Sequence, residues 1–276
     1  CAPSPAPPPR DARCARLPCE AAFTWDPSPA ERTTDVTSTT PLLETIEQEP
    51  DRPAQASVIW LHGLGADGHD FASLPPQLGI SPDIAIRHVF PHAPIMPVTM
   101  NMGTRMRAWY DIVTMDARGQ DDAGIRRSAA SIEALIAREV DRGISSTRIA
   151  LAGFSQGSAM ALFTGLRHAA PLAGIVALSG YLPLHETLPG EASPANHQVP
   201  IFQAHGKHDN VVPYGLGRST ADILGAAGYR VDWHDYEMAH QVCLEEVQEI
   251  GRFLTGVLTS ADGEPRSESA LAAETE

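Results

Sequence analysis

The sequence predicts an α/β fold with a mostly parallel central sheet and helices on both faces. Short apolar segments alternate with segments of helical periodicity over most of the 276 residues, as in repeated β-α units. Several apolar segments are continuous rather than alternating, which is typical of strands covered on both faces of a parallel sheet. Hydrophobic residues make up 43% of the chain, enough for one sizeable core.

Six apolar segments predict the strands, and four segments of helical spacing predict the helices. The expected strands span residues 57–61, 84–90, 148–153, 174–180, 200–206 and 229–236. The first expected helix follows Asp121 and stops before Gly143, and its buried face combines Ile125, Ile132, Leu135, Ile136 and Val140. The other expected helices span residues 156–168, 214–227 and 242–258.

We expect one folded domain over residues 41–258, between two tails. Residues 1–40 are rich in Pro, Ala, Arg, Ser and Thr without periodicity. Such a segment cannot bury enough apolar area to offset its ordering entropy, so we expect it to be disordered. Residues 259–276 have a similar composition with more acidic side chains, and the same expectation applies.

Charge and cysteine content exclude several classes of protein. A net charge of −14 with a single lysine, Lys207, argues against nucleic acid as a partner. No apolar segment approaches the roughly 18 residues of a membrane helix, so we expect no transmembrane span. The four cysteines have neither disulfide-framework nor zinc-site spacing, and we expect no metal and no cofactor. We expect a cytoplasmic protein; a lipid anchor on Cys1 is an alternative that the sequence does not favour.

The segment LAGFSQGSAM, residues 151–160, places Ser155 between Gly153 and Gly157. A predicted strand precedes this Gly-x-Ser-x-Gly pattern and a predicted helix follows it, which is the context of a nucleophile elbow. Glycine is expected at 153 and 157 because a β-carbon there would collide with the neighbouring strand or helix. The alternative is that Ser155 only caps the helix.

A serine nucleophile requires a histidine base and a carboxylate that orients it. The order Ser, Asp, His is expected on this fold, and Asp209 and His240 follow the last two predicted strands. Two other histidines lie nearby: we expect a structural hydrogen bond for His205, and His208 adjoins the acid too closely to be oriented by it. The carboxylates within the last strand, Asp232 and Asp235, suit a solvated or edge position.

Acyl transfer also requires two backbone donors for the oxyanion. The amide of Gln156 follows the nucleophile, and the loop LHGLGADGHDF, residues 61–71, can turn the amide of Leu64 toward it. Phosphate binding is the alternative for a glycine-rich loop, but neither the dinucleotide pattern nor Gly-Lys-Ser/Thr is present.

Together these motifs make the chain closely resemble the carboxylesterase and acyl-protein thioesterase family, also called phospholipase/carboxylesterase, of the α/β-hydrolase superfamily. Besides the elbow and the loop 61–71, the resemblance rests on FPHAPIMPVTMNMGTRMRAWYDI (90–112), LSGYLP (178–183), HGKHDNVVP (205–213) and YEMAHQVC (236–243). It implies an α/β-hydrolase fold with the triad Ser155, Asp209 and His240 and oxyanion amides on Leu64 and Gln156.

The resemblance further implies a metal-free serine hydrolase that cleaves carboxylic esters or thioesters of short or medium acyl chains. A lysophospholipase and a protein thioesterase share the triad and remain alternatives, and a non-catalytic binding module is disfavoured because no triad residue is missing. Relatives commonly form dimers, which leaves a homodimer open. One wall of the acyl groove is expected from Ile95, Met96, Met102, Met106 and Trp109, with core packing as the alternative for the methionines. Gln241 stands where many relatives carry serine.

Overall fold

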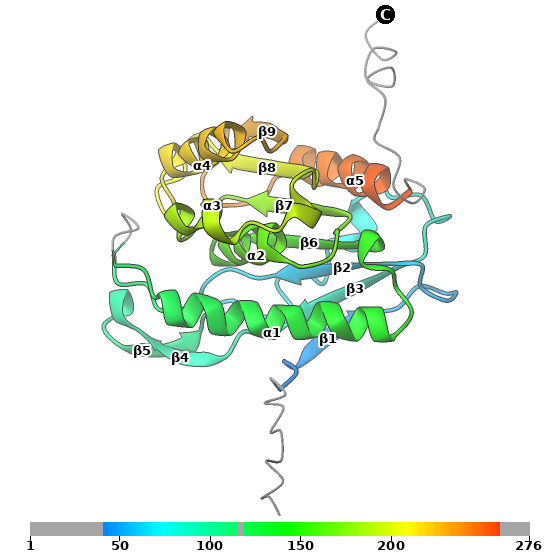
Figure 1. Ribbon diagram of the computed structural model, residues 1–276, viewed down its shortest axis with the longest axis horizontal. Coiled ribbons are helices and arrows are strands. Elements are labelled where there is room, and N and C mark those ends of the chain that lie inside the picture. The colour runs from blue at the N-terminus through cyan, green and yellow to red at the C-terminus, as the bar shows by residue number, and fades with distance from the viewer. Residues whose placement is uncertain (1–40, 115–118, 260–276) are drawn as a thin grey trace, which may run out of the picture. The chain divides into compact units, whose positions relative to one another are not determined.

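The computed structural model of the chain describes residues 41–114 and 119–259. Seven strands in these ranges form one sheet, in the order β1-β3-β2-β6-β7-β8-β9 (Figure 1). They are β1 (Thr45–Gln48), β2 (Ala56–Leu61), β3 (Ile86–Pro91), β6 (Ile149–Phe154), β7 (Gly174–Leu178), β8 (Ile201–Gly206) and β9 (Val231–Tyr236). All neighbouring strands are parallel except β1, which pairs antiparallel with β3. The predicted fold class is confirmed, whereas both predicted tails lie outside the described residues except for Thr259.

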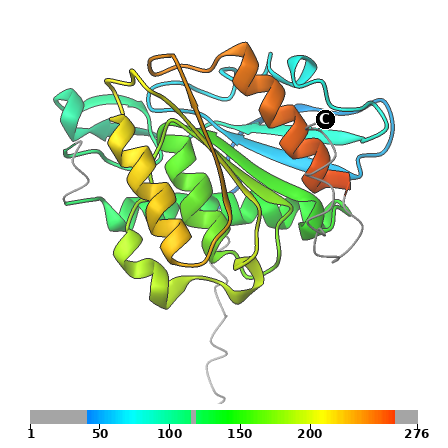
Figure 2. The same ribbon diagram turned by 90° about the horizontal axis from the view of Figure 1, so that it is seen from above.

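Helices cover both faces of the sheet. The helices are α1 (Asp122–Asp141), α2 (Gln156–Arg167), α3 (Leu188–Glu191), α4 (Tyr214–Ala226) and α5 (Leu244–Thr259). The long helices α1, α2 and α4 pack on one face, and α5 packs on the other (Figures 1 and 2). In the part of the chain that the structure describes, none of these helices has the length and apolarity needed to cross a bilayer.

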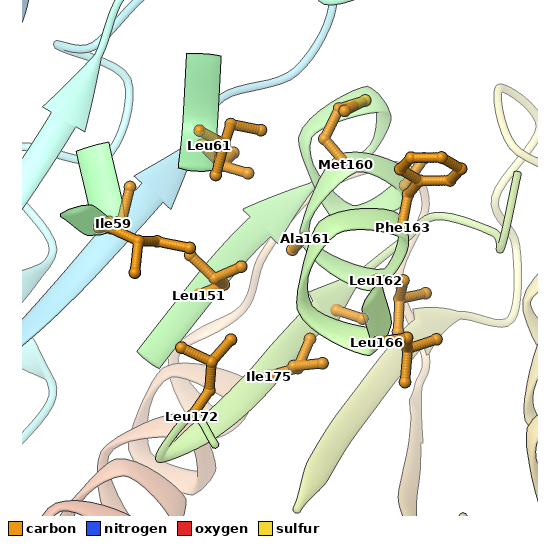
Figure 3. Packing of buried hydrophobic residues seen from close by; sticks show 14 of the residues in the cluster. Ile59, Leu61, Leu151, Met160, Ala161, Leu162, Phe163, Leu166, Leu172 and Ile175 are labelled. Carbon is orange, nitrogen blue, oxygen red and sulfur yellow. The ribbon is translucent and has the colours of Figure 1, made fainter. Parts of the chain in front are cut away.

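The central strands β2, β6, β7 and β8 are buried on both faces because most of their residues are apolar. In β2, Ile59 and Leu61 point toward the layer that contains α2, while Val58 and Trp60 point toward the layer of α5. Figure 3 shows the first layer, in which Ile59, Leu61, Leu151 and Ile175 lie beside the side chains of α2. This two-sided burial explains why the sequence has continuous apolar runs instead of alternation.

The helix α1 differs from the sequence prediction at one position. Asp121 caps its N-terminus, since the Asp121 carboxylate accepts a hydrogen bond from the Gly124 amide. Val140, predicted on the buried face, is 44% exposed, and Glu139 is fully buried instead. Glu139 follows the buried Leu135 by one helical turn, so it occupies the apolar stripe, where the Arg87 guanidinium donates a hydrogen bond of 2.8 Å to it.

Three short strands were not predicted from the sequence. The antiparallel hairpin of β4 (Ile95–Val98) and β5 (Thr104–Arg107) and the edge strand β1 have four residues each. Their sequences TIEQ, IMPV and TRMR lack the length or the apolar pattern of a buried strand. The pairing of these segments depends on neighbours that are distant in sequence.

The strand order locates the functional edge of the sheet. From β2 the chain passes to β3 on one side and then returns to β6 on the other side of β2. A crevice opens at such a reversal, outside the carboxyl ends of the two central strands. The loop after β2 and Ser155 after β6 meet there, and the loops after β8 and β9 end at the same edge because these strands are parallel.

Candidate active site

Ser155 occupies a strained turn between β6 and α2. Its backbone angles are φ 55° and ψ −119°, a conformation that non-glycine residues rarely adopt. A β-carbon on Gly153 would overlap with the carbonyl of Gly157, and one on Gly157 would overlap with the carbonyl of Leu61. The Ser155 side chain makes no capping hydrogen bond to α2, which removes the capping alternative. The turn therefore presents the hydroxyl at the edge of the sheet.

Asp209 and His240 are joined by a short hydrogen bond. The distance from His240 Nδ1 to Asp209 Oδ2 is 2.7 Å, and the Asp209 side chain is fully buried. The second carboxylate oxygen, Oδ1, accepts hydrogen bonds from the amides of Val211 and Val212 at 2.9 and 2.8 Å. Because a carboxylate only accepts, Nδ1 of His240 carries the proton and Nε2 is left as the acceptor.

Ser155 and His240 line the same cavity, which we call the inner cavity. It has a volume of about 230 Å³, and Leu64, Gln156 and Tyr110 line it as well. Its other lining residues are mostly apolar and include Met100, Ile112, Tyr181, Val211, Val212 and Leu216. Among the described residues, no hydrogen bond connects the Ser155 hydroxyl to His240, although apo structures often hold such pairs apart.

The two predicted oxyanion residues face this cavity. Gln156 is the first residue of α2, so its amide has no acceptor within the helix. No backbone acceptor in the described part of the chain pairs with the Leu64 amide. Both amides are therefore free to donate to a negative oxygen near Ser155.

The Gln156 side chain has a role that the sequence did not reveal. Its Oε1 accepts a hydrogen bond of 2.8 Å from the Trp109 amide, and its Nε2 donates one of 2.8 Å to the Tyr110 carbonyl. The residue after the nucleophile thereby fixes the segment that supplies Tyr110 to the cavity. No local pattern signals this contact, because 46 positions separate Gln156 and Tyr110.

His62 fixes the loop that carries Leu64. Its Nε2 accepts a hydrogen bond of 3.0 Å from the Ala93 amide, so the proton lies on Nδ1, which donates to the Gly63 carbonyl at 2.7 Å. Burial lowers the pKa of His62, which keeps the imidazole neutral. The His62 carbonyl also accepts a hydrogen bond of 2.9 Å from the Trp109 indole.

The five residues predicted to form the acyl-groove wall do not line the inner cavity. Trp109 is 1% exposed because its indole points to the His62 carbonyl, whereas Met102 is 96% exposed at the tip of the β4-β5 hairpin. Ile95, Met96 and Met106 lie on the same hairpin, where Met96 pairs with Met106. The same region instead contributes Met100, Tyr110, Ile112 and Thr114 to the lining.

The other histidines and aspartates near the predicted acid and base make contacts outside the triad. His205 Nε2 donates a hydrogen bond of 2.9 Å to the Val212 carbonyl, as expected for a structural histidine. His208 is exposed and bonds Glu237. Asp232 lies beside His234, and Asp235 accepts a hydrogen bond from the Tyr214 hydroxyl on the edge strand β9. In the described ranges, no cluster of three or more His, Cys, Asp or Glu side chains has the arrangement of a metal site.

This sheet, with a serine elbow after a central strand and loops gathered at its carboxyl edge, defines an α/β-hydrolase. The family model for phospholipase/carboxylesterase matches residues 44–258. Acyl-protein thioesterase 1 of Neurospora crassa is 42% identical over 78% of this chain and 92% of its own length. The acyl-protein thioesterase 1 of Mycosarcoma maydis is 37% identical over 74% and 91%.

Solved structures show the same relationship. The crystal structure of Zea mays acyl-protein thioesterase 2 superimposes with a TM-score of 0.69 at 31% identity, and the match covers 78% of this chain and 99% of that one. The chain belongs to the phospholipase/carboxylesterase family and is an ester or thioester hydrolase.

Proposed function

We propose that the chain is a serine hydrolase that cleaves carboxylic esters of short to medium acyl chains through Ser155, Asp209 and His240. The observation that carries the proposal is the hydrogen bond of 2.7 Å between His240 and Asp209, at a cavity that Ser155 also lines. Ser155 attacks the acyl carbon while His240 Nε2 takes its proton. The amides of Leu64 and Gln156 hold the oxyanion, and water then attacks the acyl-enzyme by the same route.

A fluorophosphonate probe tests the nucleophile. We expect the probe to label the wild-type protein and not a Ser155→Ala variant. The matched control is Ser158→Ala, which removes a buried hydroxyl one helical turn away that has no hydrogen-bond partner among the described residues. Labelling of Ser155→Ala at the wild-type level would disprove the assignment.

A thioesterase activity is the second candidate, and the names of the relatives favour it. The same acyl-enzyme forms from an ester or a thioester, so the triad does not separate them. A matched pair, phenyl butyrate and S-phenyl thiobutyrate, compares the two leaving atoms with the acyl group held constant. A higher kcat/KM for the thioester would move the assignment to a thioesterase.

Acyl-chain preference is tested with p-nitrophenyl esters from acetyl to palmitoyl. We expect kcat/KM to fall for the longest chains, because the inner cavity of about 230 Å³ accommodates only short or medium ones. Activity that rises up to palmitoyl would instead favour a lysophospholipase. We expect EDTA to leave the activity unchanged, because the proposed mechanism uses only side chains and backbone amides.

A further inference from the structure

A second cavity is also lined by His240. This outer cavity has a volume of about 350 Å³ and is lined by Asp70, Phe71, Ser73, Phe154, His240 and Gln241, with Leu74 and Val242. Asp70, Phe154 and His240 also line the inner cavity, so the two cavities meet at the catalytic histidine. Ser155, Leu64 and Gln156 line only the inner one.

The proposed chemistry assigns different parts of a substrate to the two cavities. When the acyl-oxygen bond breaks, the leaving group takes a proton from His240 Nε2. The leaving group must therefore lie next to His240, while the acyl carbon stays between Ser155 and the oxyanion amides. The outer cavity contacts His240 without contacting the oxyanion residues, which is the position that a leaving group requires.

Asp70 gives this position a negative charge. Among the described residues that line either cavity it is the only carboxylate, and none of them is a lysine or arginine. Within the described residues, the Asp70 side chain has no hydrogen bond or ion pair, whereas the nearby Asp67 is bonded to His69. Partial burial and the charge of Asp67 raise the pKa of Asp70, which indicates a carboxylate that lacks a compensating cation.

Two aromatic rings lie beside this carboxylate. Phe71 and Phe154 both line the outer cavity, and their ring centroids are 6.1 Å apart in an edge-to-face arrangement. The Phe154 ring also lies 4.6 Å from the imidazole of His240. Aromatic faces together with a carboxylate form the environment that attracts quaternary ammonium groups.

We propose that the outer cavity binds the leaving group of the substrate and that Asp70, with Phe71 and Phe154, selects leaving groups that carry a cationic substituent. The inference rests on the proposed serine-hydrolase function. The cation neutralises Asp70 while the ester oxygen faces His240, so the charge favours binding of the reacting complex. The same carboxylate disfavours anionic leaving groups.

Matched esters test the selectivity. O-butyrylcholine and 3,3-dimethylbutyl butyrate have the same acyl group and nearly the same shape, but only the first is cationic. The ratio of their kcat/KM values is measured at low ionic strength in wild type, Asp70→Asn and Asp232→Asn. We expect the ratio to favour the cationic ester in wild type and to fall roughly fivefold in Asp70→Asn, with a smaller fall at high salt. The control Asp232→Asn removes an exposed carboxylate that lines neither cavity, so it keeps the wild-type ratio.

The ratio corrects for any general effect of the substitution on turnover, because both esters meet the same protein. An equal ratio in wild type and Asp70→Asn would overturn the inference. If the wild-type protein cleaves neither ester, the proposed function fails. The cation site is then tested separately, by a binding measurement. Tetramethylammonium is then titrated in saturation-transfer NMR: binding that Asp70→Asn weakens supports the cation site, and equal or absent binding overturns it.

Discussion

The imidazole of His240 lies 2.7 Å from Asp209, a carboxylate whose other oxygen is held by the amides of Val211 and Val212. These contacts give the two oxygens separate roles. Oδ1 anchors the loop after β8, and Oδ2 faces the base. The charge of Asp209 and the shape of its loop can therefore be tested independently.

Asp209→Asn should abolish most of the activity without unfolding the protein. The asparagine oxygen can still accept both amide hydrogen bonds, but its NH₂ group then faces His240 Nδ1. Nδ1 must accept, so the proton moves to Nε2, which can no longer take the Ser155 proton. We expect kcat to fall by about 10⁴ in an ester assay, with an unchanged urea midpoint. The exposed Asp232→Asn is the control, and wild-type kcat in Asp209→Asn would contradict the assigned role.

His205 should act as a positioning residue for this loop. Its Nε2 donates to the Val212 carbonyl and lies 3.4 Å from Asp209 Oδ2, and burial lowers its pKa. His205→Leu leaves the buried Val212 carbonyl unpaired, which should reduce the free energy of unfolding by about 1–3 kcal/mol. We expect kcat to fall about tenfold or more with little change in KM, because the carboxylate shifts relative to His240.

The loop supplies its own control for this prediction. His208→Leu changes an exposed histidine whose side chain contacts Glu237, so activity and stability should stay at the wild-type level. His205→Gln keeps an amide donor and should recover part of the lost kcat. Equal kcat values for His205→Leu and wild type would show that His205 does not position the acid.

The elbow itself can be tested through its glycines. A β-carbon on Gly157 would overlap with the Leu61 carbonyl, a backbone atom in a central strand that cannot move aside. We expect Gly157→Ala to lower the free energy of unfolding by at least about 3 kcal/mol, measured by urea unfolding, or to prevent folding. Gly225→Ala, in α4 with open space around the position, should stabilise by about 0.5–1 kcal/mol. A stable, active Gly157→Ala would exclude the tight turn.

The sequence predicts the residues whose positions depend on the order of strands and helices along the chain. Gly153, Ser155 and Gly157 show the Gly-x-Ser-x-Gly spacing between a predicted strand and a predicted helix, which together predict the turn. The parallel order of the strands places Asp209 and His240 at the same edge. The six predicted strands all appear within a few residues of their expected bounds. The strands were predicted from continuous apolar segments and from the residues that end these segments.

Residues whose roles depend on the path of a loop were not predictable. Trp109 was expected in the groove, but its indole bonds the His62 carbonyl and the ring is buried, while the neighbouring Tyr110 reaches the cavity. The two residues are adjacent in sequence, and only the turn of the backbone decides which one faces the substrate. Asp70 belongs to the recognised loop, yet its lack of a partner becomes visible only when all its neighbours are placed.

Glu246 should make the stability of the protein depend on pH. Its side chain is fully buried in the first turn of α5, where the backbone of Cys243 and the nearby His234 offset only part of the cost of burying a charge. Burial raises the pKa of Glu246 to about 8, above the ordinary value of 4.5. Between these two values the folded protein keeps a proton that the unfolded chain releases. Stability therefore falls as pH rises through this window and levels off above the folded-state pKa.

Glu246→Gln removes this titration. We measure the free energy of unfolding of both proteins in urea at each pH. Relative to wild type, the variant should gain about 3–4 kcal/mol between about pH 5 and about pH 8. Glu245→Gln is the matched control, since Glu245 is the exposed neighbour in the same helical turn and its loss should not change the pH profile. Parallel pH profiles for wild type and Glu246→Gln would show that the buried carboxyl group does not titrate in this window. If the variant instead lost stability relative to wild type as pH rises, the sign of the prediction would be wrong.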